Sequence, residues 1–494
     1  MINRRAFLKL AGVAALMPGG CARWHAEPSG VLLNDVHSGL NQTTVRDVTP
    51  VRSIQDIQRV IERAMREERG VSVAGGRHAM GGQQFGTDAL HLDMRSFNRM
   101  LNFDSGSGLI EVEAGMQWPE LIQASRTVQA GATKQWGIAQ KQTGADRLSM
   151  GGCLSANIHG RGLKLKPFVG DIESFKLVSA DGRVMPCSRS QNSDLFKLAI
   201  GGYGLFGVVS SVTLRLMQRQ KLQRVVELVH IDEVMQRFDQ RIAEGFLYGD
   251  CQFALDPASD DFLRRGIFSC YKPVDPTMPT PAHQREIAEE QWLRLLYLAH
   301  ADKTQAFDVY SSEYLKTNGQ VYWSDTHQTS YYPEGYHQSL DHKMGVGTPG
   351  SEMISELYVP RQELASFFAD MREDFRTHNV DVIYGTIRVI ERDDESFLAW
   401  AKEPWACTVL NLHVSHTPHG IERAAASFRR LIDLARKRGG SYFLTYHKWA
   451  TRAQVEACYP QFSEFLRLKR RHDPQERFQS DWYRHYRSMF SDHL

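Results

Sequence analysis

A chain of 494 residues with 42% hydrophobic and 23% charged residues has the composition of a folded globular protein and is too long for one ordinary core. Its 59 basic and 57 acidic residues nearly cancel, which gives no reason to propose nucleic acid or a strongly anionic partner. The 7 cysteines are scattered without a CxxC pair, which argues against a disulfide framework or a zinc site.

The first 30 residues have the pattern of an export signal. Two arginines at positions 4 and 5 precede an apolar run over residues 10–17 that is too short to span a bilayer, and small residues follow. The paired arginines resemble a twin-arginine signal, and an ordinary secretory signal is the alternative. A lipid anchor at Cys21 is a minor option because Pro18 replaces the usual apolar residue. We expect an exported, periplasmic protein whose mature chain has no transmembrane span.

Residues 43–220 alternate strands and helices without a regular βαβ repeat. Apolar spacing predicts a helix over 51–70, and strands in "VSVAGG", "ALHLDM" and "GLIEVEAG" follow it. A helix opening at Pro119 and a hairpin that turns at Asp181-Gly182 come next. These patterns predict an α+β fold.

The region 221–440 predicts a second α+β unit. One helix is expected to be capped by Asp232 and closed by Gly245. "SEMISELYVP", "RQELASFFADMREDFRTHN" and "VDVIYGTIRVI" then predict a strand–helix–strand unit, and "CTVLNLHVSH" with the helix after it repeats that plan. The last segment, 441–494, is rich in arginine and aromatic residues.

Gly202-Tyr203-Gly204-Leu205-Phe206-Gly207 matches the dinucleotide fingerprint only as a string. That fingerprint needs a helix that opens at its last glycine, whereas "VVSSVTLRL" has the alternation of a strand, so we expect no Rossmann site. Two other glycine-rich stretches, 75–82 and 144–162, offer bare backbone N–H groups to an anion such as a phosphate.

Several motifs resemble a known family. "GGRHAMGGQ", "VEAGMQWPEL", "MGGCLSANIHGRG", "SADGRV" and "NSDLFKLAIGGYGLFGVVSSVTLRL" occur in order and are similar to the flavin-binding domain of the vanillyl-alcohol oxidase superfamily. "ELYVPRQEL" and "IRVIERDD" resemble its sugar-alcohol and aldonolactone oxidases and its decaprenylphosphoryl-ribose oxidase. The resemblance implies a two-subdomain PCMH-type FAD-binding domain over 43–220, a substrate or cap domain over 221–440, and a segment 441–494 that returns to the flavin site.

The resemblance also implies which residues bind FAD. The first glycine loop would wrap the pyrophosphate, and the second would line the flavin. The residues assigned to FAD in this way are Gly75, Gly76, Arg77, His78, Ala79, Gly144, Ser149, Gly151, Gly152, Asn157, Ile158, His159 and Val208. Many members tether the flavin at the place of His78, but the usual Gly-His-Ser is Arg-His-Ala here, so covalent and noncovalent FAD are both open. Cys153 is expected to be a small buried residue.

Three later side chains are predicted to act on the substrate: Arg388, His413 and Lys448, with His447 as the alternative to Lys448. Thr386-Ile387-Arg388 resembles the Glu-Ile-Arg of sugar-alcohol oxidases, with Thr386 in place of the acid. Structural alternatives are an ion pair of Arg388 with a nearby aspartate and a solvated surface position for Lys448.

His413, His416 and His419 have a spacing that resembles a metal site. We predict no metal there, because the last two fall in a strand-to-helix turn and would not converge with the first.

Together these features predict an FAD-dependent oxidoreductase. It would move a hydride from a CH–OH group of a small polar molecule, such as a carbohydrate, polyol or aldonolactone, to flavin N5, with oxygen or a respiratory acceptor as the second partner. The alternatives are a dehydrogenase of a lipid-linked sugar that reduces a quinone or cytochrome, and a flavin subunit that relays electrons without its own substrate.

Overall fold

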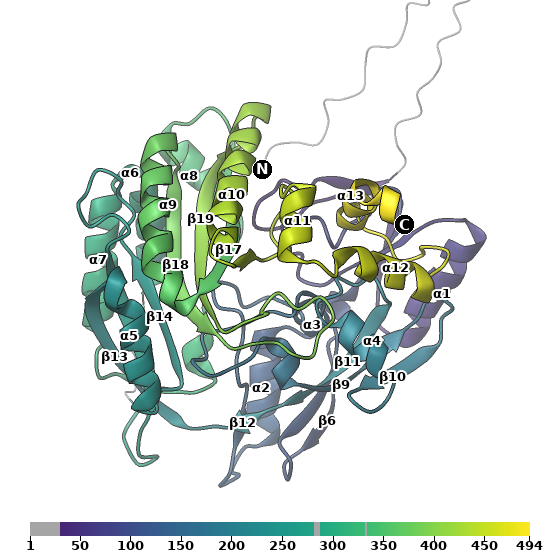
Figure 1. The fold of residues 1–494 in the computed structure, drawn as a ribbon. Coiled ribbons are helices and arrows are strands. Elements are labelled where there is room, and N and C mark those ends of the chain that lie inside the picture. Colours follow the sequence, from purple (N-terminus) through teal and green to yellow (C-terminus); the bar gives the residue numbers. More distant parts are fainter. Residues whose placement is uncertain (1–29, 281–286, 331–332) are drawn as a thin grey trace, which may run out of the picture.

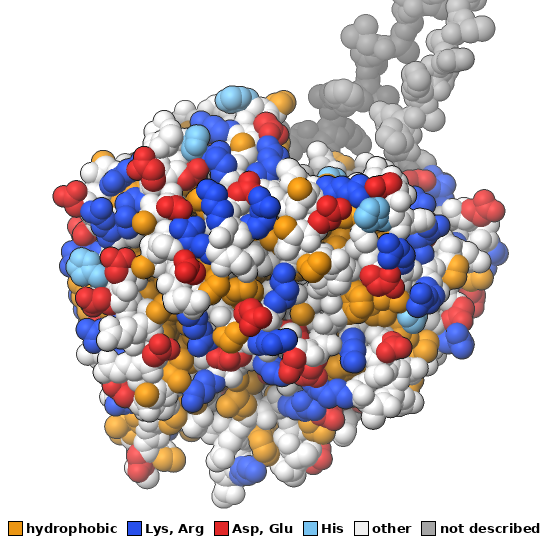
Figure 2. Space-filling model, in the orientation of Figure 1, with side chains coloured by type: hydrophobic (Ala, Val, Ile, Leu, Met, Phe, Trp, Pro, Cys, Tyr) orange, Lys and Arg blue, Asp and Glu red, His pale blue; other side chains and the backbone are white. Residues whose placement is uncertain are grey.

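The computed structural model describes residues 30–280, 287–330 and 333–494 (Figure 1). Residues 1–29, which carry almost all of the predicted export signal and Cys21, lie outside the described part. Within the described ranges, no helix combines the length and the hydropathy needed to cross a bilayer. Figure 2 shows acidic and basic side chains interspersed over the face it presents, in keeping with the near-neutral net charge.

The first part of the chain forms two sheets. A parallel sheet has the order β3 (Asp47–Pro50), β5 (Leu90–Asp93), β4 (Val71–Ala74), and α1 (Ile54–Arg66) packs on it. An antiparallel sheet has the order β10 (Val184–Ser188), β9 (Ile172–Val178), β11 (Val208–Arg215), β7 (Leu109–Glu113), β6 (Met100–Asp104). Its helices are α2 (Trp118–Val128), α3 (Met150–Ala156) and α4 (Ser193–Ala199), and two short strand pairs are β1 (Val31–Leu33) with β2 (Thr43–Val45) and β8 (Trp136–Gly137) with β12 (Met217–Gln218).

The second part is built on one eight-stranded sheet whose neighbouring strands are antiparallel. Its order is β16 (Val321–Trp323), β13 (Lys221–His230), β15 (Arg265–Pro273), β14 (Tyr248–Phe253), β18 (Val382–Ile390), β19 (Trp405–Ser415), β17 (Gly350–Pro360), β20 (Ser441–Tyr442). In Figure 1, α5 (Val234–Ala243), α9 (Leu364–His378) and α10 (Pro418–Arg436) cover one face of it. The connections also carry α6 (Glu289–Ala301), α7 (Lys303–Leu315) and α8 (Tyr336–Met344).

The C-terminal segment runs back across the first part of the chain. It contains α11 (Arg452–Cys458), α12 (Phe462–His472) and α13 (Asp481–Met489), which lie beside the first sheets in Figure 1. Phe478 forms a parallel bridge with Val71, and the ring of Phe465 meets that of Phe206 edge-on, with 5.3 Å between the centroids. One continuous buried core therefore joins the two sheets of the first part, the large sheet and the C-terminal helices.

Most elements lie where the sequence pattern predicts them, with local differences. The predicted cap of α5 is wrong: Asp232 lies in a 3₁₀ turn over Ile231–Glu233, and the helix starts at Val234 without a side-chain cap. The second glycine stretch contains the helix α3, which Ser149 caps by accepting from the N–H of Gly152. β11 begins directly after Gly207, so a strand follows the GxGxxG string, as predicted.

Candidate functional site

A cavity of about 950 Å³ lies between the glycine-rich stretches and the large sheet. Both stretches line it from one side. Strands β13, β14, β17, β18 and β19, together with α6 and α7, line it from the other side. The two parts of the chain that the sequence assigns to cofactor and substrate therefore face one shared space.

The two glycine stretches touch at the loop after β4. A Cβ added to Gly75 would overlap the Ser149 hydroxyl and lie 2.6 Å from its Cβ, and a Cβ at Gly76 would overlap the carbonyl oxygen of Arg147. A side chain at either position would therefore push the loops apart. Arg77, the next residue, has a left-handed backbone with a φ of 58°.

His78 is buried at the cavity wall, with 8% of its surface exposed. Its Nδ1 is 2.8 Å from Nε2 of His37, and its Nε2 has no hydrogen-bond partner among the described residues. Burial, with a smaller effect from His37, lowers the pKa of His78 to about 3. The imidazole is therefore uncharged near neutral pH. Its Nδ1 is held by His37, while its Nε2 is unpaired among the described residues.

Eleven of the residues predicted to bind FAD line the cavity: Gly75, Gly76, Arg77, His78, Ala79, Gly144, Ser149, Gly151, Gly152, Ile158 and Val208. Asn157 lies behind its wall, where its amide donates to Asp393 over 2.9 Å and accepts from the N–H of Val169 over 2.9 Å. His159 also lies behind the wall and contacts Glu356. Cys153 is buried, as predicted, and burial raises its pKa to about 12, which keeps the thiol neutral.

The strand register places the polar residues of the large sheet on one face. Glu356 pairs with Val409, which pairs with Thr386, while Arg388 pairs with Cys407. Side chains alternate between the two faces of the sheet along each strand. Residues two or four positions from these therefore lie on the same face of the sheet. Ile354, Tyr384, Arg388, Val409 and Asn411 all line the cavity and lie on this face.

Arg388 is a buried cation on this face, and part of its guanidinium group is unpaired among the described residues. It is 4% exposed, and one guanidinium nitrogen donates to the hydroxyl of Thr143, directly before the second glycine stretch. Its Nε and Nη1 have no hydrogen-bond partner in the described part of the chain, and the same holds for Oγ1 of Thr386 and Oε1 of Gln252. Buried polar atoms in a native protein have partners, so unpaired ones beside a cavity indicate a bound molecule or ordered water. The predicted ion pair of Arg388 with a nearby aspartate is not seen among the described contacts.

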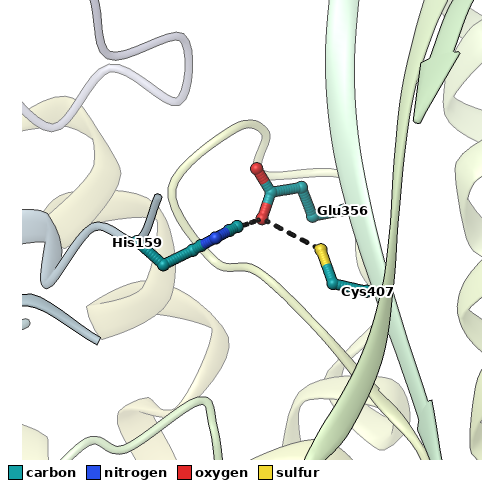
Figure 3. A group of neighbouring side chains, drawn as sticks. All are labelled: His159, Glu356 and Cys407. Carbon is teal, nitrogen blue, oxygen red and sulfur yellow. Dashed lines mark hydrogen bonds and ion pairs between the residues drawn. The ribbon is translucent and has the colours of Figure 1, made fainter. Parts of the chain in front are cut away.

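Glu356 is a fully buried carboxylate that accepts hydrogen bonds from three nitrogen and oxygen donors and a weaker one from a thiol. The first three come from Nε2 of His159 over 2.7 Å, the hydroxyl of Tyr446 over 2.6 Å and that of Tyr358 over 2.9 Å. Figure 3 shows the His159 contact and that of Cys407, whose sulfur is 3.8 Å away. Burial acts to raise the pKa of Glu356, but the charge and hydrogen bond of His159, with Arg388 and Tyr446, outweigh it and lower the pKa to about 2. Glu356 is therefore ionised at neutral pH.

Of the three predicted catalytic residues, only Arg388 lines the cavity. Nδ1 of His413 is 3.5 Å from Oε1 of Glu352, and it is Glu352 that lines the wall. Lys448 is half-buried near Gly82, and the ring of His447 packs against those of Phe428 and Trp449; neither residue lines the cavity. Tyr446, two residues before Lys448, lines it instead.

The sequence analysis missed Glu352, Glu356 and Tyr446. The two glutamates stand four residues apart in "SEMISELYVP", so they share a face of a strand whose other residues are mostly apolar. Two acids on one face of a buried strand are the signal that could have found them. Tyr446 follows the last strand in an irregular segment, where no periodicity tells which side chain points inward.

The far end of the cavity is aromatic and apolar. It is lined from α6 and α7 by Trp292, Leu295, Leu296, Phe307, Tyr310 and Tyr314. The buried guanidinium of Arg224 lies over three rings there, 5.0 Å from Tyr271, 5.0 Å from Tyr314 and 4.8 Å from Tyr322. A molecule that fills the whole space would meet polar groups near Arg388 and aromatic groups beyond them.

The residues present fit FAD. The contacting glycine loops form a cradle that Cβ atoms would fill, and they offer backbone N–H groups to a pyrophosphate. The neutral His78 and the unpaired nitrogens of Arg388 face the same cavity, one from each wall. His78, Ser149, Gly151 and Gly152 would hold the cofactor, and Arg388 would face it from the large sheet.

Comparison with known proteins supports this assignment. Residues 48–188 match the family model described as an FAD binding domain. The chain is 21% identical to the L-gulonolactone oxidase of Mus musculus over 85% of this chain and 90% of that protein, and 23% identical to an L-gulono-1,4-lactone dehydrogenase of Mycobacterium tuberculosis over 81% and 86%. It is 29% identical to the decaprenylphosphoryl-beta-D-ribose oxidase of Mycolicibacterium smegmatis over 36% of this chain and 38% of the relative.

The matched residues include β4, the first glycine stretch, β7 and α3, which build the cradle described above. FAD is the cofactor of this domain. The chain is an FAD-dependent oxidoreductase with an FAD binding domain over residues 48–188, and its relatives are members of the vanillyl-alcohol oxidase superfamily that its motifs resemble.

Proposed function

We propose that this protein oxidises a CH–OH group of a carbohydrate-like substrate, with an aldonolactone as the first candidate. The observation that carries the proposal is the buried Arg388, which has two unpaired nitrogens beside a cavity that the FAD cradle closes from the opposite side. The names of the mouse and M. tuberculosis relatives, which cover most of this chain, point to the same substrate class.

FAD, when bound, supplies the acceptor for the hydride that leaves the carbon of the alcohol. The protein must hold the hydroxyl and stabilise the negative charge that develops on its oxygen. Arg388 can do this because its Nε–H and Nη1–H are not used by described residues, and because burial strengthens its interaction with an anion.

Tyr446 orients the hydroxyl in this proposal. Its own hydroxyl donates to Glu356 over 2.6 Å, so a lone pair of the phenol oxygen can accept a hydrogen bond from the substrate. Burial and the charge of Glu356 hold the pKa of Tyr446 well above its usual value, so it acts as a neutral hydroxyl and not as a phenolate base. His159 fixes Glu356 from the other side and thereby acts as a positioning residue.

The aromatic end of the cavity favours a second candidate, the oxidation of a sugar that carries an apolar group. Trp292, Phe307 and Tyr310 would pack against that group while Arg388 contacts the sugar. The name of the M. smegmatis relative points to a substrate of this kind.

To test both candidates, the purified protein is mixed, without oxygen, with aldonolactones, polyols, simple sugars or sugars that carry an apolar aglycone, and the bleaching of the flavin is followed. Bleaching of the flavin by an aldonolactone would support the first candidate, and selective bleaching by the apolar glycosides would support the second. A protein that binds FAD and is bleached by none of these, but is reduced by a redox partner, would be a relay subunit, and the proposal would be wrong. Peroxide formation in air would identify oxygen as the acceptor, and its absence would favour a quinone or cytochrome.

We also propose the domain division that the sequence predicts. Its support is that two sheets lie within 43–220, while the eight-stranded sheet lies almost wholly within 221–440. Phe443, Thr445 and Tyr446 line the cavity, which supports a contribution of 441–494 to the active site. Limited proteolysis with and without FAD tests the division.

Two further properties are proposals from the sequence. Export by a twin-arginine signal into the periplasm is supported by the motif at residues 1–30, and cell fractionation with a variant lacking the arginine pair tests it. A covalent bond of the flavin to His78 is supported by its neutral, unpaired Nε2 at the cavity wall.

A further inference from the structure

Four side chains from three distant segments surround one buried carboxylate at the edge of the cavity. Glu352 of β17 is 4% exposed and is paired in register with His413 of β19. His300 reaches it from the last turn of α6, and His337 from the first turn of α8. Tyr336, next to His337, donates its hydroxyl to the same carboxylate.

The distances within this group are those of neighbouring metal ligands. Nε2 of His300 and Nδ1 of His413 are 3.2 Å and 3.5 Å from Oε1 of Glu352, and Nδ1 of His337 is 3.0 Å from Oε2. Ligands that lie about 2.0 Å from a tetrahedral zinc ion are about 3.3 Å from each other. The rings of His300 and His413 stand at 88° to one another, so their nitrogens approach the carboxylate from different directions.

A hydrogen bond does not explain the position of His300. Its side chain is 8% exposed and its Nε2 faces Glu352, yet this nitrogen makes no hydrogen bond to any described residue, because the geometry at 3.2 Å is unsuitable. A buried imidazole nitrogen aimed at a carboxylate without such a bond needs another partner.

The other His–carboxylate group of the described residues behaves differently. In Figure 3, Nε2 of His159 forms a direct hydrogen bond of 2.7 Å to Glu356. Two tyrosine hydroxyls complete the shell of that carboxylate. His159, Glu356 and Cys407 thus satisfy one another without an ion, whereas Nε2 of His300, in the group around Glu352, is left without a hydrogen bond to the described residues.

We propose that His300, Glu352 and His413 bind a divalent transition-metal ion, for which Zn²⁺ is the best match, while His337 contacts the other oxygen of the carboxylate. Imidazoles and one carboxylate in a tetrahedral arrangement are a zinc donor set. The hydroxyl of Tyr336 orients the carboxylate, as outer hydrogen bonds do around metal ligands. Gly350 makes room for His413, since a Cβ there would lie 2.8 Å from the Nε2 of this ring.

The ion would have a structural role. It would join α6 to β17 and β19, and would thereby fix a helix that lines the aromatic end of the cavity. The trio of His413, His416 and His419, for which the sequence predicts no metal, takes no part as such, because His416 points Nε2 at Ser351 over 2.8 Å. Only His413 of those three belongs to the group. The proposed metal site is therefore formed by the pairing of β17 with β19 and the packing of α6, and not by the spacing of histidines along one segment.

The experiment uses the full chain without an affinity tag, loaded with FAD. The protein is treated with a chelator, dialysed, supplied with Zn²⁺ and freed of excess ion, and zinc is measured by mass spectrometry. We expect about one Zn²⁺ per chain in the wild type and a loss of at least about tenfold in affinity for His300→Gln and for His413→Gln. His342→Ala, which removes an exposed histidine from α8, should bind like the wild type.

FAD content and far-UV circular dichroism show whether each variant is folded. Chelation should lower the melting temperature of the wild type and leave that of His300→Gln unchanged. X-ray absorption of the zinc-loaded wild type gives an answer even if the variants do not fold: only nitrogen and oxygen ligands are expected. A sulfur ligand would place the ion at Cys407 and overturn the proposal. So would a wild type that binds no Zn²⁺, or a His300→Gln variant that binds it equally well.

Discussion

Gly75 and Ser149 lie in contact, although 74 positions separate them along the chain. A Cβ on Gly75 would overlap the Ser149 hydroxyl, so the glycine lets two loops meet and form one cradle. On the opposite side of the cavity stands the buried Arg388, which binds the second loop through Thr143. Cofactor loops and substrate sheet are thus joined by direct contacts.

Gly75→Ala should fold but lose most of its FAD, because the added methyl group separates the loops. The double variant Gly75→Ala/Ser149→Gly should recover part of the lost FAD, since it removes both overlapping atoms, although it also removes the Ser149 hydroxyl from the cradle; glycine is tolerated at a helix N-cap at a cost of only a few tenths of a kcal/mol. FAD released from each purified variant is measured by fluorescence. Gly347→Ala, at an exposed glycine with no atom within 4 Å of the new Cβ, is the control. Full FAD content in Gly75→Ala would contradict the cradle.

Arg388→Ala should bind FAD normally but reduce it about 100- to 1,000-fold more slowly with substrate, the usual effect of removing one stabilising donor. Stopped-flow measurement of flavin bleaching gives the rate directly. Arg392→Ala, four residues later on an exposed position, should react at the wild-type rate. Equal rates in the two variants would remove Arg388 from the reaction.

Tyr446→Phe should keep the fold and the flavin, and should lower the rate of flavin reduction about 10- to 100-fold, because the substrate hydroxyl loses one of its positioning contacts. The ring stays in place, so packing is preserved. If the variant changed the melting temperature but not the rate, Tyr446 would only hydrogen-bond to Glu356 and would not position the substrate.

Glu356→Gln should lower the free energy of unfolding by about 1–3 kcal/mol, because the neutral amide weakens hydrogen bonds from His159, Tyr446 and Tyr358 that now end on a charge. Urea unfolding followed by tryptophan fluorescence measures the change. Glu227→Gln, on a partly exposed ion pair with Arg241, should cost less than about 1 kcal/mol. A Glu356→Gln variant as stable as the wild type would contradict this account of the network.

Acid should destabilise the protein well before its carboxylates titrate. Burial lowers the pKa of His91 to about 4 and that of His447 to about 3, whereas both titrate near 6.5 in the unfolded chain. Between about pH 6.5 and pH 4 the unfolded chain therefore binds more protons, and the free energy of unfolding falls as the pH falls. Each histidine contributes a slope of up to about 1.4 kcal/mol per pH unit.

Urea unfolding at about pH 7 and about pH 5 measures this slope. His447→Phe keeps an aromatic ring packed against Phe428 and Trp449 but cannot bind a proton, so the slope of its unfolding free energy with pH should correspond to about one proton fewer. An unchanged slope would show that His447 does not stay neutral in the folded protein.

His78→Ala tests the tether. The wild type, precipitated with acid, should keep its yellow colour on the polypeptide, and His78→Ala should release it while remaining folded. Colour that survives acid in His78→Ala would place the bond at another residue, and a wild type that releases its colour would show noncovalent FAD.

Local pattern predicted the strands and the glycine loops, because alternation and glycine content are properties of short segments, whereas Arg388 was selected by its resemblance to sugar-alcohol oxidases. It could not predict that Glu356 meets His159, 197 positions away, since this contact depends on how the large sheet packs on the loop after α3. After a strand of two residues, no period shows that Tyr446 lines the cavity and Lys448 does not. The helices α6 to α8, which hold the aromatic end of the cavity, were not predicted.

The central claim is that the contacting glycine loops and the large sheet enclose one FAD. The most direct measurement is the ratio of FAD to polypeptide in the purified protein, after incubation with FAD and removal of the excess. We predict a yellow protein with about one FAD per chain. A folded, colourless protein that takes up no FAD would contradict it.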